Sequence, residues 1–204
     1  MRSDRGFSLV ELVVVVAIVG ILAMVASPAF TTMMASASIS SNINGLSASF
    51  DLARSEAIGL NRMVVVCRSA DPRATAPSCS SAAAAGFGSD DWAAGWLIYA
   101  KDEGVAAPSA YDPGTDELLR RVEAEGSRSG RSRAVITPVP ATSMVAWTGN
   151  GLRNLDPTAA VPDFLIDHRD PAVTTLTDRA RCVRLSVIGR ARTGATSLGA
   201  CNVP

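Results

Sequence analysis

The chain begins with a long apolar run. Residues 7–26 are apolar at every position except Ser8, Glu11 and Gly20. As an α-helix these 20 residues extend about 30 Å, roughly the hydrocarbon thickness of a bilayer. A carboxylate in a membrane costs about 2.5–3.5 kcal/mol at the centre and less near an interface. The pattern therefore predicts a membrane-crossing helix in which Glu11 has a specific role.

A second pattern follows at the spacing of an amphipathic helix. Apolar residues recur every three or four positions, at Ile39, Ile43, Leu46, Phe50, Ala53, Ala57 and Leu60. Polar residues between them, such as Asp51 and Arg54, can face water. This periodicity predicts one long helix that continues to Leu60 and packs its apolar stripe against a head. Asn61 and Arg62 are expected to end the helix, and Pro28 to kink or loosen it.

The rest of the chain contains short runs rich in β-branched and aromatic residues. They predict strands at 63–67, 96–99, 118–122, 133–137, 143–147, 163–167 and 182–188. Gly189 is expected to start a turn after the last strand. Residues 71–91 and 104–116 are rich in Ala, Ser, Gly and Pro and predict long exposed loops. Strands after one long helix, without further helical periodicity, predict an α+β fold with the helix packed on an antiparallel β-sheet.

Charge and cysteine content narrow the interpretation. The formal net charge is +0, so bulk charge predicts no partner. The four cysteines, Cys67, Cys79, Cys182 and Cys201, contain no C-x-x-C pair, which argues against a metal site. An exported domain matures in an oxidising compartment, so disulfides are expected. Three connectivities are possible, and the spacing favours the sequence-local pairing Cys67–Cys79 and Cys182–Cys201.

Two interpretations of the N-terminus compete. In an ordinary secretory signal, residues 1–5 would form the basic region and Ala35-Ser36-Ala37 would imitate the cleavage site. The internal Glu11, the length of the apolar run and the distance to that site all disfavour this interpretation. The second interpretation rests on the segment Gly6-Phe7-Ser8-Leu9-Val10-Glu11-Leu12. This segment resembles the class III signal of type IV prepilins and type II secretion pseudopilins.

The resemblance implies how the N-terminus is processed and used. In that family a membrane peptidase cuts after the glycine, here between Gly6 and Phe7, and N-methylates the new N-terminal Phe7. The apolar helix would then remain, first as a membrane anchor and later as the packed core of a filament. Glu11 would pair with the α-amine of Phe7 on a neighbouring subunit. The pair would mainly specify the register between subunits, because a buried charge pair specifies register more than it adds stability. Pro28 matches a proline that many pilins carry after the apolar half of the helix.

Motifs further along the chain narrow the resemblance. In order they are Ala53-Arg54-Ser55-Glu56-Ala57-Ile58, Val64-Val65-Val66-Cys67, Trp92 with Gly95-Trp96-Leu97-Ile98-Tyr99, Glu117-Leu118-Leu119-Arg120, Trp147-Thr148-Gly149-Asn150-Gly151, and Arg184-Leu185-Ser186-Val187-Ile188-Gly189-Arg190-Ala191-Arg192. Together they resemble the GspH/FimT family of minor pilins and pseudopilins, which implies a type IV pilin fold. The expected organisation then begins with a leader peptide at 1–6 and a transmembrane or filament-core helix at 7–34. An amphipathic helix half follows at 35–61, and a periplasmic β-rich head with a basic C-terminal tail at 62–204.

The resemblance implies a minor pilin of a type IV pilus, placed at or near the filament tip, where it helps to prime assembly. A first alternative is pseudopilin H of a type II secretion system. In either case we expect a single-pass protein of the bacterial inner membrane with a periplasmic head, which later joins a pilus or pseudopilus filament. The expected partners are the prepilin peptidase and other major and minor pilins or pseudopilins, with no small-molecule substrate.

The basic C-terminal stretch supports a second alternative. From Arg179 to Pro204 there are five arginines and no acid. In FimT-like members a Gly-Arg-x-Arg tail is associated with DNA binding during natural transformation, and Arg190 and Arg192 match it, with Arg184 as a third candidate. Arginines on an exposed turn can contact the phosphates of double-stranded DNA. The competing interpretation is that these arginines pair with neighbouring acids or complete a sheet edge.

No catalytic constellation is visible in the sequence. His168 is the only histidine, lies in a polar segment predicted as a turn, and has no nucleophile-elbow motif to accompany it. The tryptophans Trp92, Trp96 and Trp147 are expected in the core rather than on a base-stacking platform. We therefore expect a non-enzymatic protein without cofactor or metal.

Overall fold

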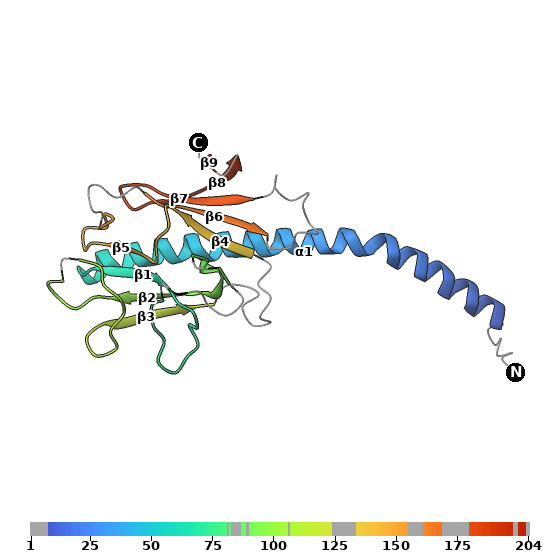
Figure 1. The fold of residues 1–204 in the computed structure, drawn as a ribbon, viewed down its shortest axis with the longest axis horizontal. Helices are drawn as coiled ribbons and strands as arrows, with labels where there is room; N and C mark the ends of the chain where they lie inside the picture. The colour runs from blue at the N-terminus through green and yellow to red at the C-terminus, as the bar shows by residue number, and fades with distance from the viewer. Residues whose placement is uncertain are drawn as a thin grey trace, which may run out of the picture.

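The computed structural model describes residues 8–80, 82, 87–88, 90–105, 107–123, 134–154, 161–168, 180–197 and 200–202, and not the side chains of 25–32, 197, 200 and 202. These residues form one long N-terminal helix and a head that packs around its C-terminal half (Figure 1). The predicted α+β class is confirmed. The head contains two antiparallel sheets, whereas the sequence predicted one.

Helix α1 (Leu9–Leu60) spans 52 residues, and its N-terminal part curves away from the head (Figure 1). Ser8 caps its start, because its hydroxyl accepts a hydrogen bond from the backbone N–H of Glu11 at 3.2 Å. Asn61 ends it in the left-handed conformation, with φ at 51°, which confirms the predicted helix end. The helical backbone continues through residue 28 without a break. The kink expected at Pro28 stays a prediction, because that side chain lies outside the described residues.

The first sheet has the strand order β3-β2-β1-β5. Its strands are β1 (Val64–Arg68), β2 (Trp96–Ala100), β3 (Glu117–Val122) and β5 (Met144–Trp147). A short 3₁₀ helix, η1 (Trp92–Ala94), precedes β2. Every residue of β1 and β2 is buried, since α1 covers one face of the sheet and loop residues pack against the other. The strand positions agree with the prediction to within about one residue.

The second sheet has the order β4-β6-β7-β8-β9. Its strands are β4 (Ala134–Val139), β6 (Asp163–His168), β7 (Arg181–Leu185), β8 (Ala191–Ser197) and β9 (Ala200–Asn202). The strand predicted at 182–188 is too long, because the chain turns back after Leu185. Gly189 ends that turn instead of starting it, and its N–H donates to the carbonyl of Ser186 at 2.9 Å. The prediction lacked β8 and β9, whose small and polar residues have no β-branched run and are held by pairing with β7.

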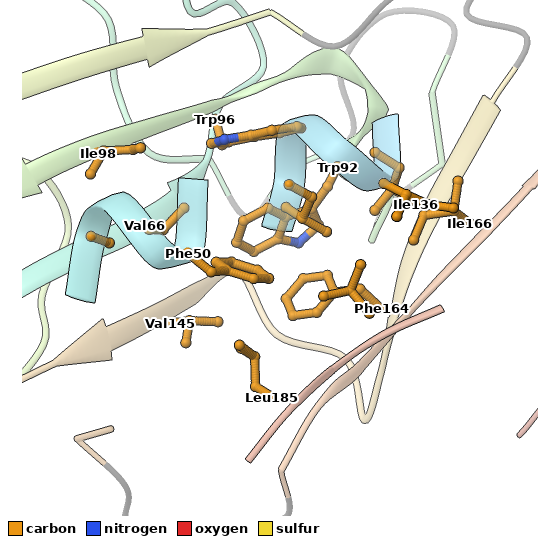
Figure 2. Packing of buried hydrophobic residues seen from close by; sticks show 14 of the residues in the cluster. Phe50, Val66, Trp92, Trp96, Ile98, Ile136, Val145, Phe164, Ile166 and Leu185 are labelled. Carbon is orange, nitrogen blue, oxygen red and sulfur yellow. The ribbon is translucent and has the colours of Figure 1, made fainter. Parts of the chain in front are cut away.

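The core lies where α1 packs against both sheets (Figure 2). Six of the seven predicted stripe residues are buried: Ile39, Ile43, Leu46, Phe50, Ala53 and Ala57. Leu60, in the last turn of the helix, is 36% exposed and was wrongly assigned to the buried stripe. The ring of Phe50 lies 5.6 Å from that of Trp147 on the first sheet and 5.1 Å from that of Phe164 on the second. The helix therefore connects the two sheets through one aromatic cluster.

All three tryptophans belong to this core, as predicted. Trp92 contacts Phe164 edge-on, with ring centroids 5.1 Å apart (Figure 2). Each indole N–H donates to an acceptor inside the head: Trp92 to the carbonyl of Thr142, Trp96 to the hydroxyl of Ser49, and Trp147 to the carbonyl of Gly189. Buried polar groups are thereby satisfied, and no indole is left free for base stacking.

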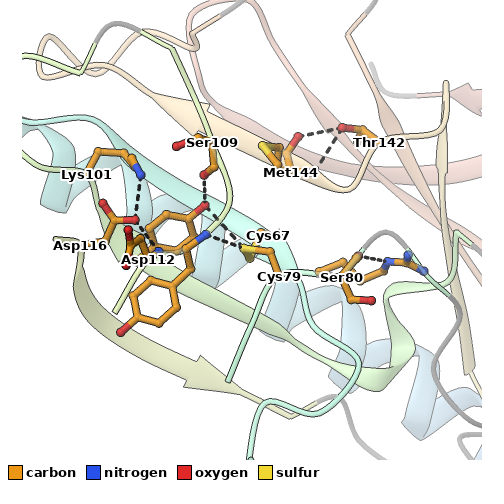
Figure 3. The surroundings of a disulfide bond; sticks show 12 residues. Cys67, Cys79, Ser80, Lys101, Ser109, Asp112, Asp116, Thr142 and Met144 are labelled. Atoms are coloured by element: carbon orange, nitrogen blue, oxygen red, sulfur yellow. Dashed lines mark hydrogen bonds and ion pairs between the residues drawn. A yellow bond between two sulfur atoms is a disulfide. The ribbon is translucent and has the colours of Figure 1, made fainter. Parts of the chain in front are cut away.

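The two long loops are less exposed than predicted, because parts of them pack on the outer face of the first sheet (Figure 3). The disulfide Cys67–Cys79 ties the first loop to β1. In the second loop, the carbonyl of Ser109 accepts a hydrogen bond from the hydroxyl of Tyr99 at 2.6 Å, and the Tyr111 ring packs against that of Tyr99. A second disulfide, Cys182–Cys201, joins β7 to β9. Both bonds follow the sequence-local pairing.

Candidate assembly surfaces

The N-terminal part of α1 presents apolar side chains outside the head. Twelve large hydrophobic residues between Leu9 and Met24, here called the apolar stalk, are each at least half exposed. An apolar surface of this extent marks a site of contact with a membrane or with other proteins, since burying apolar area contributes about 25 cal/mol per Å². Within the residues that the structure describes, no helical segment combines the length and the hydropathy that a bilayer crossing requires.

Glu11 is an acidic residue that lies among the hydrophobic residues of the apolar stalk. It lies in the first turn of α1, where an acidic side chain interacts favourably with the helix macrodipole. Ser8 and Glu11 also have the spacing of a capping box, a local role that the sequence prediction did not include although the S-x-x-E pattern is visible. Gly6 and Phe7 lie outside the described residues. The cleavage site and the pairing of Glu11 with Phe7 therefore stay predictions.

Arg184, the third DNA-binding candidate, is engaged within the second sheet. Its Nε and Nη2 donate to the two carboxylate oxygens of Asp163, each at 2.8 Å, and Nη2 also donates to the carbonyl of Cys201 at 2.6 Å. This bidentate hydrogen bonding raises the pKa of Arg184. The interpretation that the arginines pair with neighbouring acids therefore holds for Arg184.

Arg190 and Arg192 lie on a β-hairpin rather than on the predicted tail. Arg192 belongs to β8 and is paired in register with Arg184 of β7. Since Val183 and Leu185 of β7 point into the core, Arg184 and Arg192 share the outer face of the second sheet. Arg190 precedes Arg192 by two residues, at the end of the β7–β8 turn, and both side chains are exposed. The structure thus brings the three candidate arginines to one side of the head.

The end of α1 meets a turn from each sheet, at what we call the distal junction. Nε of Arg54 donates to the carbonyl of Gly151 at 3.1 Å. A Cβ on Gly149 would come within 2.8 Å of the backbone of Asn61, and a Cβ on Gly189 would come equally close to the carbonyl oxygen of Gly151. Glycine is required at these points of close approach. Arg54 and the three glycines belong to the motifs that carry the family resemblance, so those motifs connect the helix and both sheets.

A buried ion pair fastens the second loop to the first sheet (Figure 3). The Nζ of Lys101 lies 2.8 Å from Oδ2 of Asp116, with the two side chains only 6% and 0% exposed. The same oxygen accepts a hydrogen bond from the backbone N–H of Asp112 at 2.9 Å. In the sequence, Lys101 begins the segment K-D-E-G, a composition that is typical of a solvated turn. Only tertiary contacts reveal this pair.

The remaining polar residues form no reactive constellation in the described part of the chain. His168 ends β6, half-buried, and its backbone N–H donates to the carboxylate of Asp167. Among the residues that the structure describes, no three His, Cys, Asp or Glu side chains gather as ligands for a metal ion. The surfaces that remain to be explained are the apolar stalk, the outer arginines and the distal junction.

Comparison with known protein families assigns the chain to a family. The family model "Prokaryotic N-terminal methylation motif" matches residues 1–27, and the family model "Type II transport protein GspH" matches residues 42–189. The chain belongs to the GspH family. A comparison with curated proteins gave no match. Members of the GspH family are pilins and pseudopilins, structural proteins that assemble with other pilins into filaments, and the chain shares this minor-pilin or pseudopilin character.

Solved structures of similar shape show the same fold. The type IV minor pilin FimU of Pseudomonas aeruginosa matches with a TM-score of 0.53 and 19% sequence identity, over 79% of this chain and 95% of FimU. A second crystal form of FimU gives a TM-score of 0.51 at the same identity, over 79% of this chain and 99% of that one. The GspH-family chain therefore has the type IV pilin fold that its sequence motifs implied.

Proposed function

We propose that this chain is a minor pilin of a type IV pilus, incorporated at or near the filament tip, where it helps to prime assembly. The observation that carries the proposal is the apolar stalk. The head has its own core between two sheets, so the stalk is not needed to complete it. Twelve exposed large hydrophobic side chains on one continuous helix instead need a partner surface, and the matching helices of neighbouring pilins supply one.

Processing follows from the same proposal. The prepilin peptidase cuts between Gly6 and Phe7, methylates Phe7, and leaves residues 7–34 on the mature chain, with residues 7–26 as the inner-membrane anchor. The head lies in the periplasm, and its two disulfides suit that oxidising compartment. Once the anchor leaves the membrane, it joins the helical core of the filament.

Glu11 then sets the axial register of the subunit. Its carboxylate lies in the first helical turn, close to the point where cleavage creates a new α-amine. Glu11 of one subunit and the α-amine of Phe7 on a neighbouring subunit then form a buried charge pair in an otherwise apolar layer. An unpaired carboxylate in such a layer is costly, so only the register that pairs both charges is stable.

The test compares Glu11→Ala with Asp51→Ala, a change of an exposed acid on the head part of the same helix. Incorporation is measured as the amount of this chain in sheared filaments, and intact-mass analysis reports cleavage and methylation. Glu11→Ala is expected to reduce incorporation at least about tenfold, with normal folding of the head, while Asp51→Ala is incorporated normally. Normal incorporation of Glu11→Ala would contradict the register role, and absence of the wild-type chain from filaments would contradict the proposal itself.

Pseudopilin H of a type II secretion system is a second candidate, favoured by the description of the family that matches residues 42–189. The two machines are distinguished by deleting the gene in the producing organism. Loss of surface pili with normal protein secretion supports the pilus. Loss of secreted enzymes with normal piliation supports the secretion system.

DNA binding during natural transformation is a third candidate, favoured by the exposure of Arg190 and Arg192 on one side of the head. Backbone phosphates, rather than bases, are the expected contacts. Binding of double-stranded DNA to the full-length chain in detergent is measured at several salt concentrations, beside an Arg190→Ala/Arg192→Ala variant. Affinity that falls steeply with salt and is lost in the variant supports this function, whereas equal binding by both proteins contradicts it.

A further inference from the structure

Two Asn-Gly dipeptides occur in the chain, Asn44-Gly45 and Asn150-Gly151. Asparagine before glycine is chemically labile, because glycine has no side chain to hinder its own backbone nitrogen from attacking the asparagine amide. In the attack, the nitrogen loses its proton to solvent and forms a bond to Cγ of the asparagine, and ammonia leaves with a proton taken from solvent. Water then opens the succinimide ring to aspartate or isoaspartate. Both asparagines are exposed, so solvent reaches each of them.

The second dipeptide lies at the distal junction, in the turn 148–152 that follows β5. The backbone N–H of Gly151 donates to the carbonyl of Thr148 at 2.8 Å. Removal of this proton would leave the lone pair of the nitrogen directed at the Thr148 carbonyl oxygen instead of at Cγ of Asn150. The hydrogen bond therefore disfavours both the loss of the proton and the attack on the side chain.

The side-chain amide of Asn150 is held within the same turn. Its Oδ1 accepts hydrogen bonds from the hydroxyl of Thr148 and, at 3.2 Å, from the backbone N–H of Leu152. The backbone N–H of Thr148 donates to the carbonyl of Leu152 at 2.8 Å and closes the turn. An Asx turn of this kind fixes the side-chain amide relative to the backbone. We therefore expect that the turn has to open before Cγ can approach the nitrogen of Gly151.

Contacts from outside the turn hold it closed. Nε of Arg54 on α1 donates to the carbonyl of Gly151 at 3.1 Å. Gly189 of the β7–β8 turn approaches the same carbonyl oxygen so closely that a Cβ on Gly189 would come within 2.8 Å of it. Gly151 is buried, although the preceding Asn150 is exposed. The reactive nitrogen is thus protected by the helix and by the second sheet.

Asn44 is protected in a different way. It lies on the exposed side of α1, between Ile43 and Leu46 of the buried stripe, and the N–H of Gly45 belongs to the hydrogen-bond ladder of the helix. Unwinding the helix at this point would disrupt the core that it shares with both sheets. Opening the turn at Asn150 breaks only a few contacts at one end of the head, so it needs less free energy.

We propose that Asn150 is a latent deamidation site, which the distal junction keeps unreactive while it is closed and releases when it opens. This inference goes beyond the proposed function and does not depend on it. The product disfavours reclosure, because the new carboxylate lies near the C-terminal end of α1, whose last turn has no basic residue. Gly149 of the same turn lines a hollow together with Asp102 and Glu103, so the added charge meets charges of its own sign. Isoaspartate also lengthens the backbone of the turn, and each reaction thus loosens the joint between α1 and the two sheets.

The first test measures the deamidation rate of each asparagine in the full-length chain at mildly alkaline pH, folded in detergent or unfolded in guanidinium chloride with a reducing agent. Peptide mapping by mass spectrometry separates the two sites, and Asn44 is the internal control. Both should react at similar rates in the unfolded chain. In the folded chain, Asn150 should react at least about tenfold more slowly than when unfolded, yet faster than Asn44. Equal rates for Asn150 in the two states would overturn the protection, and a folded rate no higher than that of Asn44 would overturn the local release.

The second test loosens the distal junction at one contact. Arg54→Met removes the hydrogen bond to the carbonyl of Gly151, so it should raise the rate at Asn150 in the folded chain about tenfold and leave the rate at Asn44 unchanged. Arg120→Met, which changes an exposed arginine on β3, is the matched control and should alter neither rate. If Arg54→Met accelerated both asparagines equally, the opening would be global and the proposal wrong. Unchanged rates at both sites would overturn it as well.

The third test concerns the product. Asn150→Asp introduces the carboxylate without the reaction and should lower the melting temperature of the full-length chain in detergent. The loss should be larger at low salt than at high salt, because salt screens the repulsion from the acidic side chains and the helix end. A melting temperature equal to that of the wild type at low salt would show that the closed turn accepts the charge, and would overturn the loosening of the joint by the aspartate product.

Discussion

The indole N–H of Trp147 donates to the carbonyl oxygen of Gly189 at 3.0 Å, and this bond joins the two sheets of the head. Trp147 ends β5 of the first sheet, whereas Gly189 closes the β7–β8 turn of the second. A Cβ on Gly189 would lie 2.8 Å from the indole nitrogen, closer than real contacts of that kind. The two residues therefore fit together only because position 189 has no side chain.

Gly189→Ala should destabilise the head for two reasons. The glycine has φ at +79°, where alanine is strained by about 1–3 kcal/mol, and the new methyl group would collide with Trp147. Gly104→Ala is the matched control, because Gly104 has the same φ of +79° but no atom within 4 Å of the new Cβ. Thermal melting of both variants separates strain from collision. Equal losses in the two variants would show that the close approach to Trp147 contributes nothing.

Asp116→Asn should be strongly destabilising, by about 3–5 kcal/mol, because it leaves Lys101 buried without its carboxylate. Replacing both residues, in Lys101→Met/Asp116→Leu, should restore most of that loss, since it removes the burial of charge altogether. Urea unfolding of the two variants measures the difference. If the double variant were no more stable than Asp116→Asn, the ion pair itself would be the stabilising element.

Tyr99 makes a contribution to the stability of the head that is lost at high pH. Burial, and to a smaller extent the charge of Asp116, raises the pKa of Tyr99 in the folded state above its ordinary value of about 10. The contribution of neutral Tyr99 is therefore complete below pH 10 and declines as pH rises above it, because the unfolded chain ionises first. Tyr99→Phe should flatten the loss of stability above pH 10. An unchanged alkaline unfolding curve would contradict this assignment.

Removal of either disulfide should lower the free energy of unfolding by about 3 kcal/mol in the chain-entropy model. The bonds close loops with sequence separations of 12 and 19, so their effects should be similar. Guanidinium unfolding of Cys67→Ala/Cys79→Ala and of Cys182→Ala/Cys201→Ala measures each effect. A denaturation midpoint of the wild type that is insensitive to reducing agent would show that neither bond contributes.

The helix and most strands could be predicted because each has a local signature. The apolar stripe from Ile39 to Ala57 has helical spacing, and runs such as Val64-Val65-Val66 combine β-branched residues with burial. Strand β8 has no such signature. It is rich in small and polar residues, and its pairing with β7 is a tertiary effect. Arg192, predicted on a basic C-terminal tail, therefore lies in a sheet, and Arg190 lies in the turn before it.

Buried charges were the least predictable part of the candidate surfaces. Lys101, Asp116 and Arg153 lie in segments that resemble exposed turns, because short-range sequence patterns do not report which loop folds back over a sheet. The family motifs were visible in the sequence, but their common role in joining α1 to both sheets could be identified only from the contacts between them.

Helix α1 is at once the apolar stalk and the central element of the core, without a linker between the two. A tensile load applied to the stalk is therefore transmitted directly into the head. There it acts in shear along the packed stripe, and also on the bond from Arg54 to Gly151 at the far end of the helix. Contacts loaded in shear share the force instead of breaking one after another. The head is thus anchored along its whole length against being pulled from its own helix.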